Sequence, residues 1–128
     1  MRLSLIVPLA LAMSAFDGYC TNTTVARVQA PEGGREAVLF RRDCGASTGF
    51  ATHVSILPIG AEAEGAGNAF RADSDHGAAS QGDWDSVWAE ASWLDPDHLL
   101  VRDAANPRIF RQEEEVSGVR VTYESVER

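Results

Sequence analysis

The sequence predicts an all-β fold, an antiparallel meander or small sandwich built from blade-like hairpins. Short stretches rich in Val, Ile, Phe, Trp and Thr alternate with turn signals along the chain. No stretch repeats apolar residues at helical spacing for three turns, so no amphipathic helix is expected. Apolar residues make up 45% of the composition, with three Trp and five Phe, which is enough to fill one hydrophobic core.

The predicted strands follow one another closely except in the middle of the chain. They cover residues 25–30, 36–42, 50–57, 68–71, 87–93, 98–103, 108–116 and 119–126. Residues 58–85 are rich in Gly, Ala, Ser and Asp, and they are expected to form a long loop around one short strand. Such a loop is usually functional or disordered, and its part at 65–67 is expected to be mobile.

Three turns predict hairpins between successive strands. The first, at 31–34, contains Pro and two Gly, and the second, at 95–97, reads Asp-Pro-Asp. The third is the two-residue turn Ser117-Gly118, whose length and glycine are typical of a tight β-hairpin.

Alternation along the strands predicts which side chains are buried. Those expected in the core are Val54, Ile56, Ala89, Ala91, Trp93, Val119, Val121 and Tyr123. His53 and Arg120 point to the opposite faces of their strands, so both are expected to be exposed.

The first fifteen residues are predicted to be a signal peptide, which leaves a single β-rich domain over residues 16–128. A positive start at Arg2 precedes an apolar run at 3–11 and small residues suited to cleavage. A buried strand or a membrane anchor is the alternative, but the run is too short to span a bilayer. The protein is therefore expected to be exported, periplasmic or secreted, with no membrane span in the mature chain.

Cys20 and Cys44 are the only cysteines, and in an oxidising compartment such a pair most simply forms a disulfide. In the chain-entropy model a bridge of this kind stabilises a small domain by about 3 kcal/mol. The alternatives are an unpaired, inert pair, or Cys44 as a nucleophile activated by a histidine. Lipid modification of Cys20 is disfavoured, because the bulky Tyr19 stands where a lipobox has a small residue.

Charge narrows the choice of partner. All eleven basic residues are Arg, and against nineteen acidic residues they leave a net charge of −8. With no basic run to neutralise phosphates, no nucleic-acid partner is expected. The same charge disfavours anionic lipid and could steer the chain toward a basic partner.

Two segments, residues 43–57 and 67–77, resemble a group of small exported bacterial proteins of uncharacterised function. The first begins Asp-Cys-Gly-Ala-Ser-Thr-Gly-Phe, where the group usually has Thr in place of Ser47. His53 stands where Gln is common in the group, which weakens any scheme that uses His53 as a base. The resemblance covers most of the mature chain and implies export, but no activity.

The loop at 43–49 is the first part of a candidate binding site. Its two glycines and hydroxyl groups could cradle an anion, and the alternative is a tight turn that satisfies its own backbone. This loop is expected to pack against residues 68–77 at one end of the sheet. The candidate binding residues are Asp43, Ser47, Thr48, Asn68, Asp73 and His76.

Two further patterns can be explained either by a function or by structure alone. Asp73, Asp75 and His76 faintly resemble a calcium loop, but no closing Glu follows, so a solvated acidic loop is expected and no metal or other cofactor. Trp84 and Trp88 could form an aromatic platform for a carbohydrate or peptide, whereas Trp93, on the opposite strand face from Trp88, is expected in the core.

No nucleophile, base and orienting group are spaced along the sequence in a recognisable catalytic pattern. The leading hypothesis is therefore a non-catalytic exported binding or inhibitor-type domain that acts through a protein surface, with another protein of the cell envelope as partner. The alternative is a small hydrolase or ligand-binding enzyme that uses the Cys44–Gly49 loop with His76. Oligomeric state cannot be read from the sequence.

Overall fold

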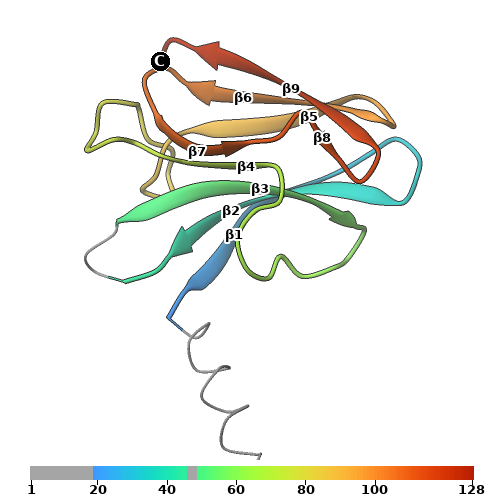
Figure 1. The fold of residues 1–128 in the computed structure, drawn as a ribbon, viewed down its shortest axis with the longest axis horizontal. Helices are drawn as coiled ribbons and strands as arrows, with labels where there is room; N and C mark the ends of the chain where they lie inside the picture. The colour runs from blue at the N-terminus through green and yellow to red at the C-terminus, as the bar shows by residue number, and fades with distance from the viewer. Residues whose placement is uncertain (1–18, 46–48) are drawn as a thin grey trace, which may run out of the picture.

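In the computed structural model, which describes residues 19–45 and 49–128, the chain folds into two β-sheets that face each other (Figure 1). The predicted signal peptide over residues 1–15 lies outside the described residues. The strands are β1 (Thr21–Gln29), β2 (Arg35–Asp43), β3 (Phe50–Pro58), β4 (Phe70–Asp73), β5 (Ala89–Asp95), β6 (His98–Ala104), β7 (Arg108–Gln112), β8 (Glu115–Val116) and β9 (Val119–Val126). The all-β prediction is confirmed, and among the described residues no helix has the length and apolarity to cross a bilayer.

Local turn chemistry explains the hairpins. β1 with β2, β5 with β6, and β8 with β9 pair antiparallel, as the three predicted turns require. Ser117 and Gly118 both have positive φ, at 53° and 81°, which a two-residue hairpin turn needs to match the twist of its strands.

The order of the strands is less regular than a meander. The first sheet has the order β1-β2-β3-β4-β7 and the second the order β5-β6-β9-β8. The predicted strand over 108–116 is in fact two strands in different sheets. Because the chain leaves the second sheet to form β7, it returns beside β6 in the same direction, and β6 and β9 pair in parallel.

The crossing from the first sheet to the second is a hydrogen-bonded corner at Glu113 and Glu114. The N–H of Glu113 donates to the carbonyl of Ala69 in the first sheet (2.9 Å), and the carbonyl of Glu114 accepts from Val121 in the second (2.9 Å). The Tyr123 hydroxyl lies 3.1 Å from the carbonyl oxygen of Ala69 and 2.7 Å from that of Glu113. One side chain thus fastens both sheets to the corner.

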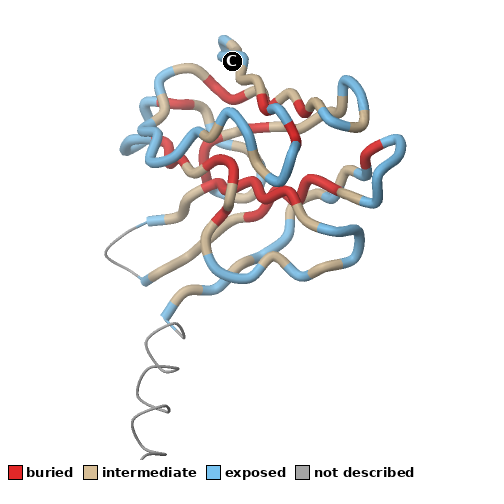
Figure 2. Tube along the Cα trace, turned by 45° about the vertical axis from the view of Figure 1, so that its right-hand side comes forward, coloured by how far each residue is buried: buried red, intermediate tan, exposed pale blue. Residues whose placement is uncertain are grey.

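The core lies between the sheets, where Figure 2 shows the buried residues concentrated. The burial predicted for five aliphatic residues is confirmed, namely Val54, Ile56, Ala89, Val119 and Val121. Ala91, Trp93 and Tyr123 are partly buried and pack against this core. Arg120 is exposed, as predicted.

The outer face of the first sheet is covered, and for this reason the predicted exposure of His53 is wrong. His53 points away from the core as alternation requires, but only 6% of it is exposed. Residues 59–69, the loop after β3 in Figure 1, lie over this face. Asn22 on β1 donates to the carbonyls of Ala63 and Gly65 in the loop, both at 2.8 Å.

Gly67 shows why this loop is not the mobile linker that its composition suggests. Gly67 is buried, and a Cβ atom built on it would lie 2.8 Å from the Val54 carbonyl oxygen and 2.9 Å from the His53 Cβ. Only glycine allows the loop backbone to approach β3 so closely.

Candidate functional site

The disulfide predicted between Cys20 and Cys44 is confirmed. The two Cα atoms lie 4.0 Å apart, and the bridge ties the chain just before β1 to the chain just after β2. Both cysteines are consumed, so the protein has no free thiol. The alternative in which Cys44 acts as a nucleophile is therefore wrong.

Two of the predicted binding residues, Ser47 and Thr48, lie outside the described residues, and two others make structural hydrogen bonds. The Asp43 carboxylate accepts the N–H of Gly45 (3.0 Å) within its own turn. The side-chain amide of Asn68 accepts the N–H of Ile56 (2.8 Å) and donates to its carbonyl (3.0 Å), which fixes the loop to β3.

The remaining two, Asp73 and His76, line a hollow of about 440 Å³ together with Gly49. The two segments expected to pack together thus meet at this hollow. His76 is exposed, and with Asp75 it occupies the left-handed region, at φ 58° and 53°. Such backbone strain in non-glycine residues is often found at functional sites.

The tryptophans do not form an exposed platform. Trp84 and Trp88 are partly buried and pack against the core, as Trp93 does. The Trp84 indole N–H donates to the Thr52 hydroxyl (2.9 Å), and the guanidinium carbon of Arg128 lies 4.2 Å from the Trp88 ring centroid. A flat aromatic binding surface is therefore not available at these two residues.

A second cavity, of about 580 Å³, adjoins this hollow on the outer face of the first sheet. We call it the arginine cavity. Its polar lining consists of Arg42, His53, Arg71, Asp73 and Arg108. Its apolar lining includes Cys44, Ala51, Ala66 and Phe110.

Sheet register brings these polar residues together from four strands. His53 of β3 pairs with Phe40 of β2 and with Arg71 of β4, and Arg42 lies two residues beyond Phe40 on the same face. Arg108 enters from β7, where it pairs with Asp73.

His53 presents an N–H donor to this cavity. Its Nδ1 accepts the N–H of Gly67 (2.8 Å), so Nε2 is the nitrogen that carries the proton. Burial, and then the positive charges of Arg42 and Arg71, lower the pKa of His53 to about 4. The ring is therefore neutral at physiological pH, and with Nε2 protonated it cannot serve as a base.

The negative charge of Asp73, the carboxylate of the cavity, is compensated by an ion pair. Burial acts to raise its pKa, but hydrogen bonds from Arg108 and from the N–H of Asp75 outweigh this effect and hold the pKa below its usual value. Arg108 contacts both oxygens, through Nε at 3.1 Å and Nη2 at 2.7 Å. This ion pair borders both the cavity and the hollow beside it.

Arg42 and Arg71 carry charges that no carboxylate in the described residues pairs with. Arg42 donates to the amide oxygen of Asn22 (2.8 Å), and Arg71 donates from Nε to the carbonyl of Gly67 (2.8 Å). Burial, Arg111 and Arg42 lower the pKa of Arg71, and this outweighs the opposite effect of Glu113. In a chain of net charge −8, the lining of this cavity thus gathers three arginines around one carboxylate.

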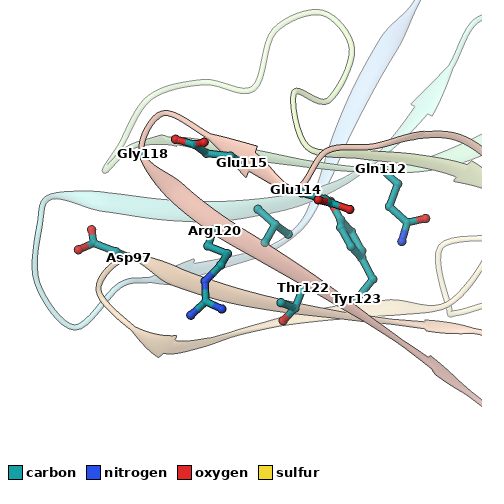
Figure 3. A pocket seen from close by; sticks show the side chains of 9 residues that line it. Asp97, Gln112, Glu114, Glu115, Gly118, Arg120, Thr122 and Tyr123 are labelled. Atoms are coloured by element: carbon teal, nitrogen blue, oxygen red, sulfur yellow. The ribbon is translucent and has the colours of Figure 1, made fainter.

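A groove of about 700 Å³ at the other sheet lies along β9 (Figure 3). There the Arg120 guanidinium, which can only donate, lies 3.2 Å from Nδ1 of His98. The proton of His98 is therefore on Nε2, which donates to the Thr122 hydroxyl (3.1 Å). His98 in this state cannot take the proton of Thr122, so the pair does not form an activated nucleophile.

Among the described residues, no group of three or more His, Cys, Asp or Glu side chains is placed to hold a metal ion. The residues that the sequence did not single out are Arg42, Arg71 and Arg108. Each lies on a predicted strand with no motif around it, and only the pairing of β2, β3, β4 and β7 brings them together. The exclusive use of Arg as the basic residue was the one available signal, since Arg is favoured where anions are bound bidentately.

Comparison with known proteins finds no matching family model, no matching curated protein and no matching solved structure.

Proposed function

We propose that this chain is an exported, non-catalytic binding domain that holds an anionic group of its ligand in the arginine cavity. The observation that carries the proposal is that the side chains lining the cavity, among the residues that the structure describes, offer donors while their carboxylate is already paired. Arg42, Arg71 and Nε2 of His53 provide N–H groups, and the carboxylate of Asp73 is already held by Arg108. Charge-assisted hydrogen bonds from guanidinium groups to carboxylates or phosphates are among the strongest polar contacts in proteins.

The rest of the lining favours an organic anion over a small inorganic one. Ala51, Ala66, Phe110 and the disulfide sulfur at Cys44 give the cavity apolar walls beside the donors. A ligand with an anionic head and an apolar body satisfies both kinds of surface, as in most binding pockets.

Export is supported by three independent features. The Cys20–Cys44 bridge is typical of an oxidising compartment. The predicted signal peptide and the resemblance to small exported proteins point the same way. The ligand is therefore a component of the periplasm or the extracellular space, and another envelope protein remains the leading candidate to supply it.

The hydrolase alternative gains no support from the described residues. Cys44 is in a disulfide, and His76 is exposed at the edge of the hollow. Neither His53 nor His98 is placed to deprotonate a nucleophile, because each holds its proton on Nε2 while its Nδ1 already accepts a hydrogen bond, from Gly67 and from Arg120 respectively.

The test is a calorimetric titration with benzoate, with benzamide as a neutral probe of the same shape. We expect benzoate to bind and benzamide to bind at least tenfold more weakly, with an affinity for benzoate that falls as salt is raised. Arg42→Gln should weaken benzoate binding about tenfold, which corresponds to about 1.4 kcal/mol.

Arg102→Gln is the matched control, since Arg102 is a partly exposed residue of β6 in the other sheet and pairs with Glu90 and Glu124. It should leave benzoate binding unchanged. Equal binding of benzoate and benzamide, or an equal loss in both variants, would refute the arginine cavity as the site.

A further inference from the structure

β7 is the outermost strand of the first sheet, and in the part of the chain that the structure describes it pairs only with β4. All five of its residues are exposed, and Ile109 and Phe110 expose 44% and 58% of their surface. Natural proteins usually protect such an edge with proline, lysine or a covering segment. Pro107 stands just before β7 and the register with β4 shifts between Arg71 and Ala72, but β7 itself has no proline or lysine and its Arg108 and Arg111 are paired with Asp73 and Glu113. An edge without a covering strand is a place where an extended chain can add as a further strand.

The two faces of β7 differ in chemistry. Arg108 and Phe110 line the arginine cavity on the outer face. Ile109 pairs with Ala72, a fully buried core residue of β4, and so belongs to the inner face. A strand added beside β7 would place successive side chains alternately next to the cavity and next to Ile109.

We infer that β7 binds an extended polypeptide segment of another exported protein, in which acidic and apolar residues alternate. The acidic side chains enter the arginine cavity and the apolar ones cover Ile109, while the main chain pairs with the free edge of β7. This inference rests on the proposed function, because the cavity is what selects the acidic residue. Glu113, Glu114 and Glu115 follow β7 directly, so the acidic residue lies near Arg108 and not at the corner.

Charge argues against a second copy of this chain as the occupant. β7 itself carries two arginines and no acidic residue, so two β7 strands paired with each other would not supply the missing carboxylate. A partner segment with acidic residues complements Arg42 and Arg71, whose charges lie close enough together for Arg42 to affect the pKa of Arg71, whereas Arg111 already pairs with Glu113 (2.6 Å).

The test begins with selection of nonapeptides from a random displayed library against the intact, disulfide-bonded protein. We expect enrichment of sequences in which Asp or Glu alternates with Val, Ile or Phe. A selected peptide should lose at least tenfold in affinity when its acidic residue is changed to the amide. N-methylation at successive positions should weaken binding at every second residue, which is the signature of strand addition.

Ile109→Asp should abolish peptide binding, since it places a charge where an apolar side chain docks. The matched control is Leu94→Asp, at an exposed apolar residue of β5 at the edge of the other sheet. Leu94→Asp should leave peptide binding unchanged, and benzoate binding should persist in both variants.

The outcomes separate the two proposals. If benzoate binds through the arginines but the library yields no acidic-apolar pattern, or N-methylation has no period of two, the inference about β7 is wrong and the proposed function stands. If neither benzoate nor any acidic peptide binds, both fail. A dimer in solution that Ile109→Asp dissociates would show that a second copy occupies β7, which also overturns the inference.

Discussion

On the inner face of the first sheet, Val54 and Phe70 pack against the second sheet with no polar partner, whereas on the outer face His53 and Glu36 are just as inaccessible but are held by hydrogen bonds. Glu36 accepts from Arg27 (2.5 Å) and from the N–H of Gly60 (2.8 Å). The inner face thus contributes the core between the sheets, whereas the outer face, which also buries Val38 and Phe40, positions a loop through hydrogen bonds. A hydrogen-bonded surface, unlike an apolar one, can retain N–H donors that are available to a ligand. These donors lie in the arginine cavity.

The largest effect should come from the inner face. Phe70 is fully buried and its ring stacks on Tyr123 at 5.8 Å between centroids. Phe70→Ala should lower the free energy of unfolding by about 3–5 kcal/mol through lost transfer energy and a cavity. Urea denaturation measures this, and Phe110→Ala, on exposed β7, is the control expected to change little. A loss below about 1 kcal/mol would show that the inner face is not the main source of stability.

On the outer face we expect a dependence on pH. The pKa of His53 is lowered from 6.5 to about 4 in the folded protein, so the unfolded chain takes up the proton first. The stability that comes from keeping His53 neutral is fully present above pH 6.5. It is lost as pH falls toward 4, and the total loss in the free energy of unfolding is about 3 kcal/mol.

His53→Gln removes the titrating group and can still accept the N–H of Gly67. The variant and the parent should therefore differ in the slope of unfolding free energy against pH between 4 and 6.5, while effects from Asp73 cancel in the difference. Urea denaturation at pH 7, 5.5 and 4.5 gives the two slopes. Parallel slopes would mean that His53 is not held neutral in the fold.

A smaller effect should follow from detaching the loop. Asn68→Ala leaves the N–H and carbonyl of Ile56 without the side-chain partner, which should cost about 1–3 kcal/mol. Asn68→Asp keeps the acceptor for the N–H of Ile56 but sets a second acceptor against its carbonyl, so it should not restore the stability of the parent. Hydrogen exchange over residues 59–68 should be faster in Asn68→Ala than in the parent, and an unchanged exchange rate would show that Asn68 does not anchor the loop.

The sequence predicts what depends on neighbours along the chain. The turns at 31–34 and 117–118 contain residues that tolerate positive φ, and both hairpins form where expected. Alternation also gives the direction of every side chain on β3 correctly. The parallel pairing of β6 with β9 could not be read from the sequence, because it depends on the chain first crossing to the other sheet.

The candidate site was harder to predict, for two physical reasons. The cover over His53 comes from a glycine-rich segment that resembles a mobile loop, and its order depends on side-chain bonds from Asn22 and Asn68 to backbone. The arginine cavity depends on register between strands distant in sequence, which no local pattern encodes. The sequence did predict that the end of the 43–49 loop lies beside Asp73 and His76.

The corner held by Tyr123 has a consequence for the order in which the fold assembles. The hairpins β1–β2 and β5–β6 contain only local contacts, so they can form early, whereas β9 must close a longer loop to reach β6. Until β9 is in place, the carbonyl of Glu113 lacks the Tyr123 hydroxyl that fastens the corner. The pairing of β7 with β4 joins residues further apart in the sequence than that of β6 with β9, 35 positions for Asp73 and Arg108 against 22 for His98 and Arg120. The edge beside the arginine cavity therefore forms late, and the ability to bind depends on nearly complete folding.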